Sequence, residues 1–195
     1  FYRLSEDLDF AVSVPIDATR STRSKAANPF RELVETVTAG SASFMSCTPL
    51  RGYNNSTQYA TEVEYASVIT GGPARIKLEI SVREPILDIP TKLPCRVLLR
   101  DPFRKESVLT SQGVTALSLR ETYAEKLRAA LTRRVPAIRD FFDIDYALRQ
   151  GLIQLEQVDL IEMLQCKLAI PGNSDIDMSQ EKYDALDGQL LTQLR

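Results

Sequence analysis

The sequence predicts an α+β protein in which a mixed sheet is followed by a helical C-terminal half. In the first half of the chain, short apolar segments alternate with polar residues, as in strands that bury one face. In the second half, apolar residues recur at helical spacing, and strands and helices do not alternate as in repeating βαβ folds. We expect a sheet domain over residues 1–117 and a helical bundle over residues 118–195.

The predicted sheet domain begins with a strand over residues 3–10. A polar and basic loop over residues 21–28 follows, and then a helix from Pro29 to about Ala39. Asn54-Asn55 and Gly71-Gly72 are typical turn dipeptides, so the β segments on either side of them predict an antiparallel meander. These segments span residues 43–50, 58–69 and 75–82, with further short strands expected near residues 96–99 and 114–117.

Four helices are predicted for the second half. Ser118 and Glu121 form a capping box that begins a helix to about Arg134, and Pro136 begins a second helix that Gly151 ends. A third helix is expected over residues 155–169, and a fourth after Asp177. The expected inward face of the third helix consists of Val158, Ile161, Leu164 and Leu168.

Composition excludes several classes of function. The chain contains no histidine, which rules out Ser-His-Asp triads, Cys-His pairs and histidine-ligated metals. Cys47, Cys95 and Cys166 are isolated, odd in number and without C-x-x-C spacing, which argues against a zinc site and a disulfide framework, so a cytoplasmic protein is expected. No apolar run approaches the roughly 18 residues of a membrane span. The chain opens without Met, so we expect that sequence is missing upstream.

Charge is segregated along the second half. Residues 120–139 carry six basic groups against two acidic ones, whereas residues 140–187 carry eleven acidic groups against three basic ones. The basic cluster is compatible either with binding a triphosphate or an RNA backbone, or with a solvated helix face.

The opening strand places Asp7 and Asp9 on one side and Leu8 and Phe10 on the other. Two neighbouring carboxylates repel each other unless a cation lies between them, and oxygen ligands suit Mg²⁺ or Mn²⁺. A D-x-D strand is therefore a candidate half of a metal site for nucleotidyl transfer. The alternative is a solvated edge strand with two surface aspartates.

Further along the chain, other charged residues extend this candidate site. Glu79 alternates with core residues on its strand and is either a third carboxylate of the site or one half of a cross-strand surface Lys–Glu pair. Lys126 lies off the apolar stripe of its helix, where it is free to reach a phosphate, and Asp140 would orient it or contact the nucleotide. Asp140 and Asp143 share one helix face, so a structural Lys–Asp pair is the alternative.

Together these segments resemble the AbiEii/AbiGii toxin family, which is similar to the MenT toxins. The resemblance is carried, in order, by R-x-S-x-D-x-D-F at residues 3–10, K-h-E-h at 77–80 (h, hydrophobic), A-E-K-L-x-A-x-x-x-R at 124–133 and R-D-x-x-D-I at 139–144. It implies a DNA polymerase β-like nucleotidyltransferase fold and the toxin half of a bacterial toxin–antitoxin or abortive infection system. Some relatives transfer nucleotides to tRNA, and others were described as NTP-binding.

Carried over by position, the resemblance implies that Ser5, Asp7 and Asp9 match the metal-binding motif and that Glu79 matches the acidic strand position. Lys126 and Asp140 match the lysine and aspartate of the helical motifs, and both are expected to contact the nucleotide, as is Ser5. The implied enzyme uses Mg²⁺ or Mn²⁺ and an NTP, modifies an RNA such as the 3′ end of a tRNA, and has an antitoxin protein as partner.

The sequence departs from the family pattern in one respect. In the family, a G-G-T or G-S turn that holds the β- and γ-phosphates precedes the D-x-D strand, and residues 1–6 contain no such turn. Either the turn lies upstream of Phe1, or the phosphate grip is incomplete. Two alternatives to RNA modification remain open: transfer to a protein acceptor or of the γ-phosphate on the same fold, and a module that binds nucleotide, RNA or antitoxin without catalysis.

Overall fold

The computed structural model describes residues 7–94, 100–108, 113–173 and 175–193. The chain divides into two compact units, residues 1–86 and 87–195. This division falls earlier than the predicted boundary after residue 117. The reason is that β6 (Thr91–Pro94) and β7 (Gly113–Ala116) pair with each other in a two-stranded sheet that, among the described residues, is separate from the main sheet.

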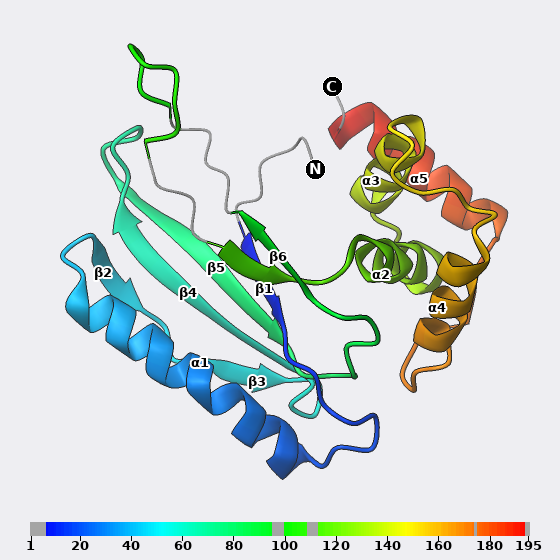
Figure 1. Cartoon of the computed structure of the whole chain (residues 1–195), viewed down its shortest axis with the longest axis horizontal. Coiled ribbons are helices and arrows are strands. Elements are labelled where there is room, and N and C mark those ends of the chain that lie inside the picture. Colours follow the sequence, from blue (N-terminus) through cyan, green and yellow to red (C-terminus); the bar gives the residue numbers. More distant parts are fainter. Residues whose placement is uncertain (1–6, 95–99, 109–112, 174, 194–195) are drawn as a thin grey trace. The chain divides into compact units, whose positions relative to one another are not determined.

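The first unit is a five-stranded mixed sheet with one long helix (Figure 1). The strands run in the order β1-β5-β4-β2, and β3 also pairs with β4. β1 is parallel to β5, whereas β4 pairs antiparallel with β5, β2 and β3. The bounds are Asp7–Ala11 for β1, Phe44–Cys47 for β2, Arg51–Tyr53 for β3, Gln58–Ala66 for β4 and Pro73–Ser81 for β5.

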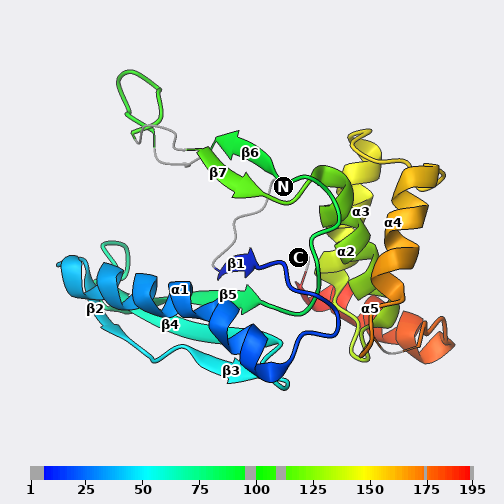
Figure 2. The ribbon, with the colours of Figure 1, turned by 60° about the horizontal axis from the view of Figure 1, so that its bottom comes forward.

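Helix α1 (Arg20–Gly40) runs along one face of this sheet (Figures 1 and 2). The predicted loop over residues 21–28 is wrong, because the helix already begins at Arg20. The hydroxyl of Thr19 caps it by accepting the backbone N–H of Thr22 at 3.2 Å, and burial of Ala27 holds its first turns against the sheet. The core of this unit consists of Val14, Ala27, Tyr59, Ile80 and Val82.

The meander predicted from the turn dipeptides is present. Asn54 and Asn55 both adopt positive φ, 49° and 54°, in the turn between β3 and β4. Asparagine tolerates this left-handed region better than most residues, which explains why the Asn-Asn dipeptide indicates a turn. Gly71, at φ 70°, turns the chain between β4 and β5. The strand predicted near residues 96–99, and residues 3–6 of the opening strand, lie outside the described residues.

All four predicted helices are present in the second unit. Ser118 caps α2 by accepting the backbone N–H of Glu121, and Gly151, at φ 63°, follows the end of α3. The bounds are Leu119–Thr132 for α2, Ile138–Arg149 for α3, Val158–Leu168 for α4 and Gln180–Gln193 for α5. The core of this unit consists of Tyr123, Ala124, Ala147, Ile153, Leu160 and Met163. Among the described helices we find none with the length and hydrophobicity needed to cross a bilayer.

The predicted inward face of α4 is only partly correct. Val158 and Ile161 are exposed and Leu164 and Leu168 are half-buried. The fully buried residues of the helix are Leu160, Met163 and Lys167. Hydrophobic spacing alone favours the apolar stripe, but Lys167 lies inward because its ammonium group binds two carboxylates of α2. A paired lysine thus occupies a position on the inward face of α4, which hydrophobic spacing alone does not predict.

Candidate active site

The parallel pairing of β1 with β5 brings the predicted carboxylates together. Asp9 is the register partner of Glu79, and Asp7 is the partner of Lys77. Register partners point to the same face of a sheet, and their strands lie about 4.8 Å apart. The opposite face is packed against α1, where the rings of Phe10 and Phe30 lie 5.4 Å apart. The acidic residues therefore lie on the face turned away from α1, which we call the carboxylate face.

Lys77 lies among these carboxylates. Its Nζ is 2.6 Å from Oε1 of Glu79, and the two side chains are 44% and 47% exposed. The hydrogen bond with Glu79 raises the pKa of Lys77, the charges of Glu79, Asp7 and Asp9 add to this effect, and burial opposes it. A surface Lys–Glu pair is thus present, but it lies along one strand and not across two strands as the alternative had it.

The donor set of the carboxylate face suits a hard divalent cation, because every donor is a carboxylate oxygen. Within the described part of the chain, however, no three Asp, Glu, Cys or His side chains are gathered in an arrangement ready to hold a metal ion. Glu79 is engaged by Lys77 instead. Asp7, Asp9 and Glu79 therefore fit Mg²⁺ or Mn²⁺ by the type of their donor atoms, although Glu79 is paired with Lys77. Ser5 lies outside the described residues.

In the helical unit, Lys126 contacts Asp143 and not Asp140. Its Nζ lies 2.7 Å from Oδ2 of Asp143, whose side chain is only 3% exposed. Asp140 and Asp143 are one helical turn apart on the same face of α3, so sequence spacing could not distinguish them. Asp143 is therefore the residue that orients Lys126, and it is missing from the predicted site.

Asp140 is buried in the first turn of α3, where the helix dipole favours a carboxylate. Nε of Arg133 lies 3.3 Å from Oδ2 of Asp140, but among the described residues this oxygen has no hydrogen-bond partner. Buried polar atoms are nearly always hydrogen-bonded, so an oxygen that retains this capacity marks Asp140 as a candidate ligand contact.

The basic cluster of residues 120–139 is not a continuous cationic surface. Arg120, Lys126, Arg128 and Arg133 each bind carboxylates of their own unit. Arg134 and Arg139 are exposed and have no ion pair within the described parts of the chain. Four of the six basic residues are thus neutralised by carboxylates of the same unit. This pairing argues against the RNA-binding surface that the net charge of the segment suggested.

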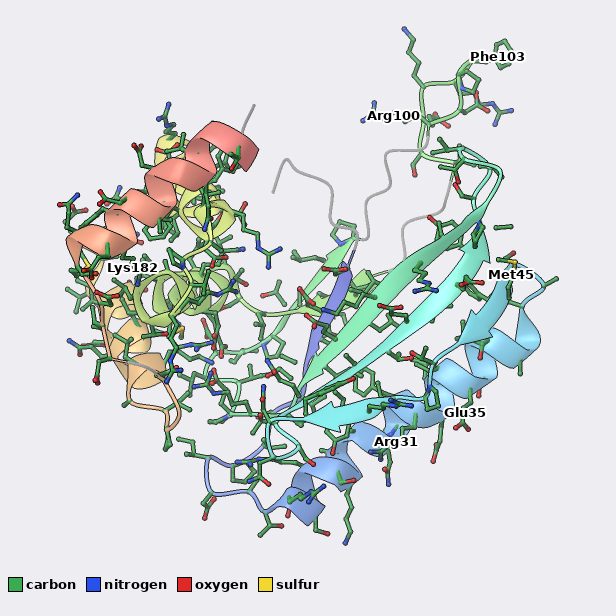
Figure 3. The ribbon with its side chains drawn as sticks, turned by 180° about the vertical axis from the view of Figure 1, so that it is seen from behind. Arg31, Glu35, Met45, Arg100, Phe103 and Lys182 are labelled. Carbon is green, nitrogen blue, oxygen red and sulfur yellow. The ribbon has the colours of Figure 1, made fainter. Side chains whose placement is uncertain are left out.

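The first unit also contains an open groove of about 440 Å³ between α1 and the β2 region. Arg31 and Glu35 of α1 and Met45 of β2 line it (Figure 3). In the sheet order, β2 and β1 lie at opposite edges, so the groove is remote from Asp7 and Asp9. None of the predicted site residues lines it.

We expect Lys126→Met to lower the free energy of unfolding by about 3 kcal/mol, because it leaves the buried Asp143 carboxylate without its counter-charge. Urea denaturation of the full chain would measure this. The double variant Lys126→Met/Asp143→Asn, which removes the stranded charge, should recover at least half of the loss. If the double variant is less stable than Lys126→Met, the pair is not the cause of the loss.

A mixed sheet with a D-x-D edge strand opposite a glutamate, followed by a helical unit, defines a nucleotidyltransferase-like fold. The chain belongs to the family described as "Nucleotidyl transferase AbiEii toxin, Type IV TA system", which it matches over residues 1–192. This confirms both the resemblance drawn from the four motifs and the predicted fold class.

A solved structure supports the fold independently. The crystal structure of JHP933 from Helicobacter pylori superposes with a TM-score of 0.51 at 18% sequence identity and covers 97% of this chain. At this identity the likeness concerns the fold alone. The chain spans 64% of the length of that protein. No match was found among curated proteins.

Proposed function

We propose that this protein is a metal-dependent nucleotidyltransferase toxin that transfers a nucleoside monophosphate from an NTP to a hydroxyl group of RNA, with the 3′ end of a tRNA as the candidate acceptor. The observation that carries the proposal is the register of β1 with β5, which sets Asp9 opposite Glu79 on the carboxylate face. Membership of a family of nucleotidyl transferase toxins supports it.

The proposed reaction is an in-line displacement. The acceptor hydroxyl oxygen forms a bond to the α-phosphorus of the NTP, the bond from this phosphorus to the bridging oxygen breaks, and pyrophosphate leaves. Asp7, Asp9 and Glu79 would hold Mg²⁺ or Mn²⁺, which supplies charge neutralisation and orientation when bound. The proton of the hydroxyl passes to a carboxylate or to water, which agrees with a chain that has no histidine.

For the helical unit, we propose that Lys126 neutralises phosphate charge and that Asp143 holds its ammonium group in position. Their 2.7 Å contact and the burial of Asp143 support these roles. We further propose that Oδ2 of Asp140, which is ion-paired with Arg133 but has no hydrogen-bond partner among the described residues, accepts a hydrogen bond from the nucleotide. Because the family belongs to toxin–antitoxin systems, an antitoxin protein is the proposed partner.

Incubation of the full-length protein with total RNA, a divalent metal and NTPs labelled at the α-phosphate tests this function. We expect label in RNA with α-³²P-NTP and none with γ-³²P-NTP, because the transferred group contains the α-phosphorus. Label from γ-³²P would establish phosphorylation instead, and label in protein would establish a protein acceptor. A protein that blocks growth but labels neither RNA nor protein is not a transferase.

One observation favours a second function, that of a module that binds nucleotide, RNA or antitoxin without catalysis: Lys77 pairs with Glu79, one of the proposed metal ligands. Calorimetry with NTP and Mg²⁺ separates the two functions. Nucleotide binding that requires Mg²⁺ supports the transferase, whereas binding that is equally strong without the metal supports the module.

A further inference from the structure

The structure gives Lys77 a central place on the carboxylate face. In the sheet register its neighbours are Asp7 on β1 and Glu62 on β4, and Glu79 lies two residues further along its own strand. Neighbouring strands are about 4.8 Å apart, and residues i and i+2 of one strand are about 7 Å apart. A lysine side chain spans these distances, so the ammonium group of Lys77 is within reach of all three carboxylates.

Arg75, on the same strand and the same face, serves a different set of carboxylates. Its guanidinium group lies 3.3 Å from Glu62 and 3.4 Å from Glu64. Since Arg75 engages Glu62, the ammonium of Lys77 pairs with Glu79 on the side of the predicted metal ligands. The two cations of β5 thus contact different acids: Arg75 pairs with Glu62 and Glu64, whereas Lys77 pairs with the predicted metal ligand Glu79.

We propose that Lys77 is a positioning residue that sets the metal affinity of the site, because its ammonium group competes with a divalent cation for Glu79. The inference rests on the proposed function, in which Asp7, Asp9 and Glu79 hold the metal. The ammonium group 2.6 Å from Oε1 of Glu79 occupies one acceptor position of this carboxylate, and its positive charge repels a divalent cation bound beside it. Lys77 thus balances the acidic cluster without metal and raises the metal concentration needed to fill the site.

The size of the effect follows from electrostatics. Between an ammonium group and a divalent cation about 7 Å apart in a solvated site, repulsion weakens metal binding about fivefold. Arg75 is four residues from Glu79, a distance of about 13 Å along an extended strand, which exceeds the screening length of about 8–10 Å at moderate salt. Loss of the Arg75 charge should therefore change metal binding by less than about twofold.

The test measures Mn²⁺ binding to the full chain, without nucleotide, by the electron paramagnetic resonance of free Mn²⁺. We expect Lys77→Met to lower the Mn²⁺ dissociation constant about fivefold. The matched control Arg75→Met should stay within about twofold of wild type, and Lys77→Arg, which keeps the charge, should remain close to wild type. Lys77 and Arg75 are both solvent-accessible, so we expect the variants to fold, and circular dichroism would verify this.

Two failures can be told apart. If wild type binds Mn²⁺ and Lys77→Met binds it equally or more weakly, the competition is wrong while the metal site stands. If neither wild type nor Lys77→Met binds Mn²⁺, the carboxylate site of the proposed function is wrong, and the competition with it. An equal gain in Lys77→Met and Arg75→Met would show a general effect of net charge and would also overturn the role of Lys77.

Discussion

Asp9→Ala is expected to reduce nucleotide transfer at least about 10³-fold and to abolish toxicity, without unfolding the protein. The loss of a metal-binding carboxylate removes charge stabilisation of several kcal/mol from the transition state, and about 4 kcal/mol corresponds to this factor. The fold should persist because the side chain of Asp9 is exposed and the pairing of β1 with β5 is made by the backbone. The measurement is α-³²P transfer to RNA, together with growth on induction of the full-length protein.

The matched control for this prediction is Asp17→Ala. Asp17 is also an exposed aspartate of the first unit, but it lies outside β1 and the carboxylate face. It should retain the transfer rate and the toxicity of wild type. An Asp9→Ala variant that still transfers nucleotide at a rate near that of wild type would exclude Asp9 from the site.

The second large effect is expected for Glu121→Ala, which should lower the free energy of unfolding by about 4 kcal/mol. Glu121 is fully buried and accepts the backbone N–H groups of Leu87 and Asp88, both at 2.9 Å. Its carboxylate also lies 2.7 Å from Nζ of Lys167, which is 2% exposed. Truncation therefore leaves two backbone donors without acceptors and an ammonium group with only part of its compensating charge. Urea denaturation followed by the helical circular dichroism signal would measure the loss.

Two further variants serve as controls: one changes an exposed glutamate, and the other removes the buried charges while keeping the side-chain volumes. Glu156→Ala changes an exposed glutamate of the same unit and should alter stability by less than about 0.5 kcal/mol. Glu121→Gln/Lys167→Met removes both charges while keeping similar volumes, so it should lose less than Glu121→Ala. A loss below about 1 kcal/mol for Glu121→Ala would show that the buried network contributes little.

Alternation along β1 and β5 was enough to predict from sequence which residues share the carboxylate face. Leu8 and Phe10 alternate with Asp7 and Asp9, and this alternation is a property of the single strand, independent of its neighbour in the sheet. The parallel pairing of β1 with β5 could not be predicted in this way. The alternation shows which side chains share a face of the sheet, but not which strands are neighbours. The start of α1 at Arg20 was missed because the polar and basic residues in its first turns resemble a loop.

The errors in the helical unit have a different cause. The inward position of Lys167 depends on Glu121 and Glu125, which belong to another helix and are distant in sequence. Likewise, only the packing of α2 with α3 determines that Lys126 contacts Asp143. Spacing within one helix carries no information about such contacts, so ion pairs between helices are the part of the site that sequence patterns leave undetermined.

The ion pairs made by the basic residues of α2 and its C-cap Arg133 affect how the protein could bind an RNA. A protein gains affinity for a nucleic acid when its free cations release condensed counterions from the phosphates, and this gain falls steeply with salt. Arg120, Arg128 and Arg133 are already neutralised by neighbouring carboxylates, so they have little of this gain to offer. The contribution of these three residues to RNA binding would therefore depend only weakly on ionic strength, which leaves the exposed Arg134 and Arg139 as the cations of this cluster that could contact phosphates.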